Sequence, residues 1–318
     1  CPSYRVTGEE QHLTRGRANS LRLAISGQLG ADALVSDAMY ETMELCVSCK
    51  GCKRECPTGV DMAKMKIEFL HQYYGKHRLP IKEYLVAFLP RYAHWAGNFS
   101  MLLNLRDQIP GLAKLSELLL GFSSRRQLPR WQRDRFNAEK EIPKKSTGEE
   151  NAREVVLLVD TFNTCFEPEN ARAALAVLTA AGYKVLCPSP LDKGRPLCCG
   201  RTFLSGGLVN EARVEAERMI DTLMPFVERG VPIIGLEPSC LLTLRDEFPS
   251  LLPGADTDEL AENAFLLEEF LVAEHGKGRL HLKLKPLPIK QALLHGHCHQ
   301  KAFDVMSSVQ QVLALIPD

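Results

Sequence analysis

Residues 46–57 read CVSCKGCKRECP and contain four closely spaced cysteines: Cys46, Cys49, Cys52 and Cys56. A cubane iron–sulfur cluster needs thiolates that converge on one small volume, and two-residue spacing lets three cysteines of a single loop reach three irons. The small residues Ser48 and Gly51 leave room for the backbone to wrap closely around a cluster, where its amides can bond the sulfides. The run therefore predicts a [4Fe–4S] cluster on its first three cysteines, whereas a zinc ribbon would need two separated CxxC pairs.

The chain opens with Cys1-Pro2, which repeats the Cys56-Pro57 pair at the end of the same run. In ferredoxin motifs of this spacing, the fourth cysteine ligates the other of two clusters. We therefore expect Cys1 to be the fourth ligand of the first cluster. Cys56 would belong to a second cluster, whose other three ligands precede residue 1. The alternative is that Cys1 is incidental to metal binding and is not a ligand.

A second group of cysteines lies further along the chain: Cys165, Cys198, Cys199 and Cys240. Adjacent cysteines rarely bridge to each other, because that disulfide is strained, but both can serve one metal centre, and Gly200 after them permits close backbone approach. The first and last of the group each follow an expected strand, so we expect all four at one edge of a sheet, as a metal or redox site. The alternative is a set of buried, inert thiols. Cys187 is interpreted as a core residue.

A third motif is His295-Gly296-His297-Cys298-His299, at the end of an expected strand. The segments VVLLVDTFNTC and QALLHGHC both run from aliphatic residues to a cysteine. This faint internal repeat makes Cys298 the first ligand of a further metal site. The histidines could bind zinc or support that site, but we interpret each of them as an ordinary polar residue at a strand end.

Composition and charge limit the classes of function. Apolar residues make up 45% of the 318 residues, enough for a buried core. The 39 basic residues balance 39 acidic ones, which gives no electrostatic reason to expect nucleic acid as a partner. Neither a transmembrane run nor a secretory signal is visible, so the grouping among the 11 cysteines indicates metal ligation in a reducing compartment. Phosphate-binding glycine loops, a serine nucleophile and a catalytic carboxylate pair are not found.

Apolar residues at helical spacing predict an all-α domain of ferredoxin type over residues 1–122. Within it, Cys46–Thr58 is expected as a tight loop, and Asp61 is a suitable N-cap for a helix over residues 62–74. Three residues would share the buried face of that helix: Met65, Phe69 and Tyr73. Residues 123–153 are strongly polar and are interpreted as a linker, with a docking arm through Trp131 and Phe136 as the alternative.

Residues 154–318 alternate between strands and helices, which predicts a parallel α/β sheet. The expected strands cover residues 155–159, 184–187, 231–236 and 291–295. The expected helices cover residues 168–181, 209–229, 258–275 and 303–315. The predicted fold is thus an α-helical domain followed by a cysteine-rich α/β domain.

CVSCKGCKRECP, together with two cysteine-rich α/β half-sites, resembles the cysteine-rich iron–sulfur proteins. These include the glycolate oxidase iron–sulfur subunit, the small subunit of anaerobic glycerol-3-phosphate dehydrogenase and the B subunit of heterodisulfide reductase. Four segments resemble one set more closely: CPSYRVTGEEQHLTRGRANSLR, RPLCCGRTFLSGG, GLEPSCLLTLRDEF and HGHCHQKA. That set is the iron–sulfur region of the large bacterial FAD-linked D-2-hydroxyacid dehydrogenases of the D-lactate or D-2-hydroxyglutarate type. The resemblance covers nearly the whole chain.

The resemblance implies an electron-transfer role. In such enzymes FAD accepts a hydride from a D-2-hydroxy acid (D-lactate, D-2-hydroxyglutarate or glycolate), and [4Fe–4S] clusters pass the electrons singly to a quinone or cytochrome. The 318 residues hold neither the flavin domain nor a second Cys-Cys-Gly, so we expect an internal part of such an enzyme, truncated at its C-terminus. Alone it would be inactive, and the FAD domain of the same protein would be its partner. A cytoplasmic location is expected, with peripheral association at the inner face of the membrane.

Two other functions stay open. A thiol–disulfide redox protein similar to heterodisulfide reductase would place Cys198 and Cys199 at a reactive centre, which requires an exposed thiol of low pKa. In that enzyme the first half-site ends in CxxC, whereas here Cys240 is the single cysteine of Glu237-Pro238-Ser239-Cys240. The chain thus departs from the ligand pattern of that enzyme's noncubane cluster, although four thiolates remain. The third function is a zinc-stabilised interaction module.

Overall fold

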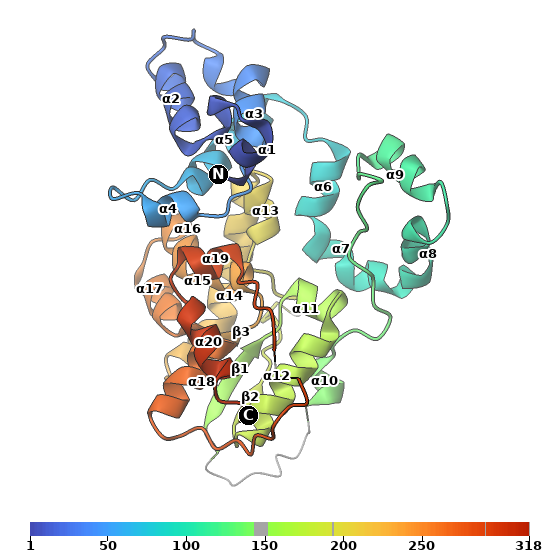
Figure 1. Ribbon diagram of the computed structural model, residues 1–318, viewed down its shortest axis with the longest axis vertical. Helices are drawn as coiled ribbons and strands as arrows, with labels where there is room; N and C mark the ends of the chain where they lie inside the picture. Colours follow the sequence, from blue (N-terminus) through green and yellow to red (C-terminus); the bar gives the residue numbers. More distant parts are fainter. Residues whose placement is uncertain (143–151, 193, 290, 318) are drawn as a thin grey trace. The chain divides into compact units, whose positions relative to one another are not determined.

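The computed structural model describes residues 1–142, 152–192, 194–289 and 291–317 (Figure 1). The chain divides into two compact units, each made of separate segments of the sequence. Unit 1 comprises Cys1–Ala87, Thr202–Ala212 and His295–Met306. Unit 2 comprises Phe88–Arg201, Arg213–Leu294 and Ser307–Asp318. Among the described residues, no helix combines the length and the apolar character needed to cross a bilayer.

The described part of unit 1 is helical. Its first segment contains α1 Pro2–Thr7, η1 Glu10–His12, α2 Thr14–Ile25, η2 Ala33–Val35, α3 Asp37–Glu44, α4 Gly51–Glu55, α5 Met62–Lys76 and α6 Ile81–Ala87. Two short helices from later segments join it: α13 Arg201–Ser205 and α19 Cys298–Ala302. The expected loop over Cys46–Thr58 therefore contains one short helix, α4.

Helix α5 is the best-defined element of unit 1, and its start follows from one side chain. The Asp61 carboxylate accepts hydrogen bonds from the Ala63 and Lys64 amides, which satisfies two free donors of the first turn. The prediction of this helix and its cap is confirmed. Phe69 and Tyr73 are buried as expected, but Met65 is exposed, so that part of the predicted face is wrong. The buried face includes Met62 and Leu70 instead: residues 62, 69, 70 and 73 follow the helical period, and residue 65 lies to one side of them.

Gly207 lets a distant segment approach α5 closely. Its φ of +73° lies in the left-handed region, and a Cβ at this position would come within 2.5 Å of the Leu70 Cβ. The His71 Nδ1 lies 3.1 Å from the Gly207 carbonyl oxygen. Only glycine fits this contact without displacement, so residues 202–212 are anchored on α5 at this point.

Unit 2 combines a helical region with a sheet. The helices before the sheet are α7 Leu89–Ala96, η3 Gly97–Phe99, α8 Ser100–Asn104, η4 Leu105–Asp107, α9 Leu112–Leu120 and α10 Ala138–Glu141. The strands are β1 Glu154–Leu158, β2 Lys184–Leu186, β3 Ile233–Gly235 and β4 Ala264–Leu266. The helices that alternate with them or follow are α11 Thr161–Cys165, α12 Pro168–Ala180, α14 Val209–Val227, α15 Pro238–Asp246, α16 Phe248–Leu251, α17 Ala255–Glu262, α18 Leu267–Gly276 and α20 Met306–Leu313.

The sheet has the order β2-β1-β3-β4, and all its pairings are parallel. The predicted parallel α/β arrangement is confirmed. Its first three strands fall where the aliphatic runs placed them: β1 is shifted by one residue, and β2 and β3 are shorter than expected. Because the strands are parallel, their carboxyl ends all lie at one edge of the sheet.

The predicted fourth strand is wrong. Residues 291–297 form no strand, and Leu293 in their middle is 99% exposed. The fourth position in the sheet belongs to β4, where Ala264 pairs with Ile233. The expected single helix over residues 258–275 is correspondingly two helices, α17 and α18, with β4 between them.

The core of the sheet takes residues from several segments. Val155, Leu157 and Ile234 of the strands pack with α12, α18 and the partly buried Val312 of α20 (Figure 1). Phe136, from the segment expected as a solvated linker, is buried in the same cluster. Ala138 and Ile142 of the same segment also pack against this cluster. Residues 143–151 of the linker lie outside the described residues.

Candidate metal-binding sites

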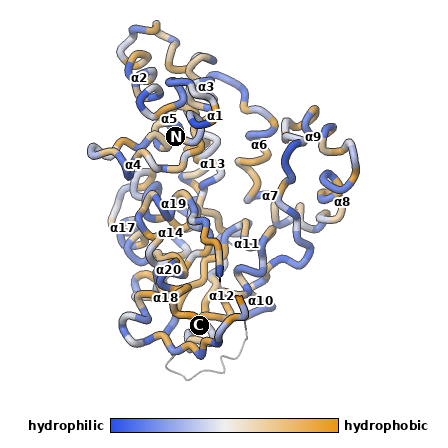
Figure 2. Tube along the Cα trace, viewed as in Figure 1, coloured by the Kyte–Doolittle hydropathy of each residue, from blue (hydrophilic) through white to orange (hydrophobic). Residues whose placement is uncertain are grey.

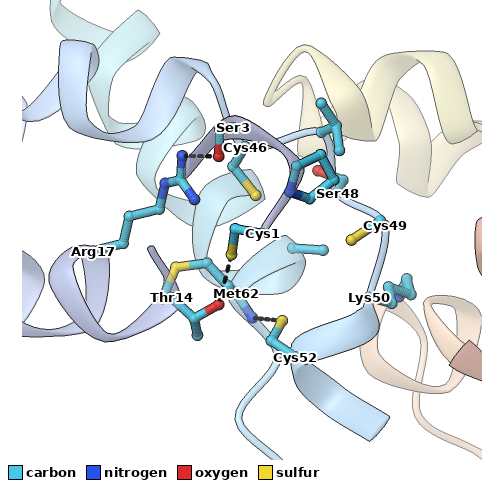
Figure 3. A pocket seen from close by; sticks show the side chains of 13 residues that line it. Cys1, Ser3, Thr14, Arg17, Cys46, Ser48, Cys49, Lys50, Cys52 and Met62 are labelled. Carbon is cyan, nitrogen blue, oxygen red and sulfur yellow. Dashed lines mark hydrogen bonds between the residues drawn. The ribbon is translucent and has the colours of Figure 1, made fainter. Parts of the chain in front are cut away.

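Four thiols line one pocket in unit 1, as the sequence predicted for the first cluster (Figure 3): Cys1, Cys46, Cys49 and Cys52. Cys1 is the N-cap of α1, Cys46 and Cys49 lie between α3 and α4, and Cys52 belongs to α4. The Cys1 Sγ lies 3.2 Å from the Thr14 hydroxyl, and the Cys52 Sγ accepts the Met62 amide at 3.4 Å. All four are free thiols, so the pocket offers the donor set of a cubane cluster.

The loop between these cysteines has an unusual backbone. Ser48 and Lys50 have φ values of 52° and 58°, in the left-handed region that residues other than glycine rarely adopt. Alternation of right- and left-handed residues turns successive amides toward one concavity, a feature of many iron–sulfur sites. Strain of this kind persists where the surroundings fix it, and it concentrates at functional sites. The loop conformation therefore fits the binding of an anionic cluster.

Arg17 is a buried cation beside the pocket, and sequence reasoning missed it. Its Nε donates to the Thr42 carbonyl at 2.9 Å, and its two terminal nitrogens donate to the His12 carbonyl at 2.8 Å and the Ser3 hydroxyl at 3.1 Å. Burial lowers the pKa of Arg17, whereas the charges of Cys46, Cys52 and Cys49 raise it. The guanidinium is thus held rigidly where thiolates would place negative charge.

Two lysines add positive charge around the same loop. Lys50 is buried, with its Nζ 3.5 Å from the Asp61 carboxylate. Lys66 donates to the carbonyls of Glu44 and Cys46, each at 2.7 Å. Burial lowers the pKa of Lys66, and the charge of Cys46 raises it. Burial raises the pKa of the Cys52 thiol, and the hydrogen bond from the Met62 amide lowers it. The cations around the loop would offset the negative charge of metal-bound thiolates.

Cys56 lies outside this pocket. Its Sγ is 3.1 Å from the Thr58 hydroxyl. That hydrogen bond, with amides of the turn at residues 58–60, lowers the pKa of the Cys56 thiol. The structure thus places the fourth cysteine of the run apart from the first three, as expected of a cysteine that belongs to another cluster.

Helix α19 packs on the cysteine loop, which sequence reasoning also missed. The buried His299 places its Nε2 3.1 Å from the Ser48 carbonyl oxygen. Arg54 contacts the Lys301 carbonyl and forms an ion pair with Asp304 at 2.7 Å. No local pattern signals this contact, because the partners lie about 250 residues apart in sequence.

Cys298 does not lie where the repeat placed it. It is the exposed first residue of α19 rather than a residue at the carboxyl end of a sheet strand, because residues 291–297 form no strand. The repeat was therefore misleading about position. His297 and His299 are the N-cap and a buried residue of this short helix.

The second group of cysteines lies at the carboxyl edge of the sheet in unit 2. Helix α11 follows β1 and ends at Cys165, and α15 follows β3 and carries Cys240 in its first turn. Acidic caps start both helices: Asp160 accepts the Phe162 amide at 2.8 Å, and Glu237 accepts the Cys240 amide at 3.0 Å. The expected common edge for these cysteines is therefore present.

Three of the four thiols interact directly. The Cys199 thiol hydrogen-bonds to the thiols of Cys198 and Cys240, and all three are buried. These bonds lower the pKa of Cys199 and raise the pKa of Cys198 and Cys240, so Cys199 is the favoured thiolate. The cation of Arg201, paired with Glu247 at 2.5 Å, lowers the pKa of Cys199 further.

Gly200 allows the close backbone approach that its position after Cys199 suggested. Its φ of +75° lies in the left-handed region, and its amide donates to the Cys198 Sγ at 3.3 Å.

Cys165, the fourth cysteine of the group, is buried among Ala93, Phe162 and Phe166, and burial raises its pKa to about 11. Cys187 packs against the core of the sheet, and burial raises its pKa to about 12.

Among the described residues, no three His, Cys, Asp or Glu side chains converge tightly enough to hold one metal ion. One zinc ion needs all its ligand atoms at about 2.0–2.3 Å. The thiolates of a cubane each bind a different iron, so their sulfur atoms lie further apart. The four-thiol pocket in unit 1 has the donor set that a cluster requires, and two of its lining residues, Ser48 and Lys50, have left-handed backbone conformations.

Comparisons with known proteins agree with this chemistry. The family model described as 4Fe-4S dicluster domain matches residues 1–60. D-2-hydroxyglutarate dehydrogenase of Pseudomonas putida is 26% identical over 301 residues, which cover 80% of this chain and 28% of that protein. The C subunit of anaerobic glycerol-3-phosphate dehydrogenase from Escherichia coli is 29% identical over 161 residues, 49% of this chain and 39% of the relative.

The glycolate oxidase iron-sulfur subunit of Escherichia coli is 24% identical over 238 residues, 74% of this chain and 52% of the relative. No solved structure gives a match. The chain spans less than a third of the length of the D-2-hydroxyglutarate dehydrogenases that it resembles. Residues 1–60 therefore match a 4Fe-4S dicluster domain, and the chain is homologous to D-2-hydroxyglutarate dehydrogenases and to the glycolate oxidase iron–sulfur subunit.

Proposed function

We propose that this chain is the iron–sulfur electron-transfer part of an FAD-linked dehydrogenase that oxidises a D-2-hydroxy acid. The observation that carries the proposal is the pocket lined by Cys1, Cys46, Cys49 and Cys52, within the residues that match the dicluster domain. The substrate class follows from relatives that are dehydrogenases of D-2-hydroxyglutarate and a subunit of glycolate oxidase. D-lactate, D-2-hydroxyglutarate and glycolate are the candidate substrates.

On this proposal, the helical residues 1–122 form a ferredoxin-type domain and residues 154–318 a cysteine-rich domain. Cys1, Cys46, Cys49 and Cys52 hold one [4Fe–4S] cluster. Cys56 helps to hold a second cluster. The position of Cys56 outside the four-thiol pocket supports this division.

The clusters supply one-electron transfer when bound. The chain's own residues would set the conditions for it: residues 46–52 would enclose the cluster, and Arg17 and Lys66 would offset its negative charge. FAD, in a partner domain, would accept two electrons as hydride from the substrate. A quinone or cytochrome would be the acceptor, and we propose a cytoplasmic location with peripheral attachment to the membrane.

Cys198, Cys199 and Cys240, with Cys165 at the same sheet edge, are proposed as a second metal or redox site. The hydrogen bonds among the first three and the cation of Arg201 support it. Cys298 stays a prediction as a ligand. A heterodisulfide-reductase-like thiol exchange is less well supported, because Cys198, Cys199 and Cys240 are all buried, whereas such chemistry needs an exposed thiolate.

The test is electron transfer from substrate to cluster. The 318-residue chain with its clusters, mixed anaerobically with the FAD-bearing dehydrogenase domain, is expected to lose visible cluster absorbance when one of the three acids is added. The chain alone, with the same acids and an artificial acceptor, is expected to show no turnover. Turnover by the chain alone, or no bleaching with the flavin domain present, would contradict the proposal.

A further inference from the structure

A helical arm in unit 2, defined here as residues 95–120, exposes many large apolar side chains. Helix α9 consists mostly of leucine and alanine, yet none of its residues is buried. The most exposed members of the arm are Met101 (83%), Leu118 (81%), Trp95 (66%), Leu102 (65%) and Leu119 (62%). Figure 2 shows apolar residues along α8 and α9, followed by a hydrophilic segment. So dense a set of exposed apolar groups marks a surface that meets a partner.

The arm is held in a defined conformation. Arg106 donates to the Ser116 hydroxyl at 3.2 Å and to the Ser123 carbonyl at 2.8 Å, which ties η4 to α9 and to the segment after it. Asn104 and Trp131 exchange two hydrogen bonds of 2.9 Å between the Asn104 side chain and the Trp131 backbone. The apolar side chains are therefore presented by an ordered scaffold, so binding through them carries a smaller entropic cost.

Positive charge accompanies these apolar groups. Residues 95–135 contain seven Lys or Arg and three Asp or Glu, although the whole chain has 39 of each sign. Five of these cations are exposed: Lys114, Arg125, Arg126, Arg130 and Arg133. Two of the acids are hydrogen-bonded within the region, Asp107 to the Leu128 amide and Glu117 to the Ser124 hydroxyl. Leucine, methionine and tryptophan beside exposed arginines match the interface of an anionic lipid bilayer.

We propose that the helical arm binds the surface of membranes that contain anionic lipid. Met101, Leu118 and Leu119 enter the boundary between headgroups and acyl chains, Trp95 lies at headgroup level, and the arginines after α9 contact lipid phosphates. The arm would be the site of the peripheral membrane attachment that the proposed function includes. This inference rests on the proposed function only for its purpose, which is the delivery of electrons to a membrane quinone. The binding itself requires no cluster.

The test is sedimentation of the 318-residue chain with vesicles of phosphatidylcholine, with and without phosphatidylglycerol. We expect binding to the anionic vesicles, weakened by salt, and little binding to the neutral ones. The double variant Leu118→Ser/Leu119→Ser and the charge reversal Arg125→Glu/Arg126→Glu are each expected to weaken binding by about tenfold or more. Leu191→Ser is the matched control, because Leu191 is equally exposed (66%) but lies outside the arm.

Absence of binding to anionic vesicles, or unchanged binding by the Leu118→Ser/Leu119→Ser variant, would overturn the proposal. So would self-association of the chain, or capture of the FAD domain, that depends on the same leucines without any vesicle binding. Circular dichroism of each variant excludes unfolding as the cause. Cluster content and substrate-driven bleaching are measured without lipid, so failure here is distinguishable from failure of the proposed function.

Discussion

Arg17 is the residue that ties the fold of unit 1 most directly to the charge of a cluster. It is a fully buried cation beside the four-thiol pocket, and it donates hydrogen bonds to the Thr42 and His12 carbonyls and to the Ser3 hydroxyl. A fixed positive charge favours the reduced, more negative state of a cluster. Replacing Arg17 with glutamine is therefore expected to lower the reduction potential by on the order of 60 mV, a tenfold change in a one-electron equilibrium.

The measurement is a potentiometric titration followed by electron paramagnetic resonance. Arg15→Gln is the control, because Arg15 lies on the same helix but is 82% exposed. Arg17→Lys keeps the charge and should recover much of the wild-type potential. If Arg17 had a structural role alone, Arg17→Gln and Arg17→Lys would both lose the cluster, and the reduction potential would not follow the charge at position 17.

Asp160 gives a prediction of pH dependence at the carboxyl edge of the sheet. Burial is the main cause that raises its pKa to about 6, with the charges of Glu237 and Cys199 adding to it. The ordinary value in an unfolded chain is about 3.9, so between about pH 4 and pH 6 the native state binds more protons than the unfolded state. The free energy of unfolding therefore falls as pH rises through that window and levels off above it.

Asp160→Asn keeps an oxygen to cap α11 but cannot titrate. The difference in unfolding free energy between this variant and the wild type should thus change by on the order of 2 kcal/mol from pH 4 to pH 7, in favour of the variant at the higher pH. Urea denaturation across the range measures it. A constant difference would mean that the pKa of Asp160 is not raised.

At the scale of elements, Glu215 holds α14 to the loop that leads to Cys198 and Cys199. This buried carboxylate pairs with Arg195 of the loop, with Arg218 of its own helix at 2.9 Å, and with Arg91 of α7 at 3.4 Å. Removing one partner of a buried charge network typically costs about 3–5 kcal/mol. Glu215→Gln is expected to lose that amount, measured by denaturant unfolding. Glu217→Gln, at an exposed position on the same helix, should change stability by less than about 0.5 kcal/mol.

Elements with local signals could be predicted, and those that depend on distant partners could not. Asp61 marks the start of α5 because capping is local, and the aliphatic run of β1 is long enough to identify a buried strand. The three residues of β4 lie between helical patterns, where periodicity cannot separate strand from helix. Residues 291–295 have the composition of a strand, but a strand exists only where a neighbour pairs with it, and Leu293 is exposed instead.

The same division applies to the sites. Cysteine spacing predicted which thiols line the pocket in unit 1, because Cys46, Cys49 and Cys52 lie on one loop. Arg17 and His299 reach that loop through tertiary contacts, and in isolation a buried arginine or a histidine in a polar run has no distinguishing pattern. The link among Cys198, Cys199 and Cys240 could be anticipated only from the shared edge of parallel strands.

At the scale of the whole molecule, metal binding is expected to contribute to the stability of unit 1. Ligation would tie Cys46, Cys49 and Cys52 of one loop to a single cluster and so add folding energy there. Removal of iron by a chelator under reducing conditions should therefore increase hydrogen exchange in residues 46–58 and in α19, while the β1 and β3 amides change little. Equal loosening of β1 and β3 would contradict this assignment of the metal to unit 1.

The central claim is that Cys46, Cys49 and Cys52, with Cys1, hold a [4Fe–4S] cluster. The most direct measurement is the iron and acid-labile sulfide content of anaerobically prepared protein, with the electron paramagnetic resonance spectrum of the reduced form. Cys49→Ser is expected to lose the iron, the sulfide and the signal of one cluster. Cys187→Ser, at a thiol packed against the sheet core, should keep all three. Full iron and sulfide in Cys49→Ser with an unchanged spectrum would contradict the account.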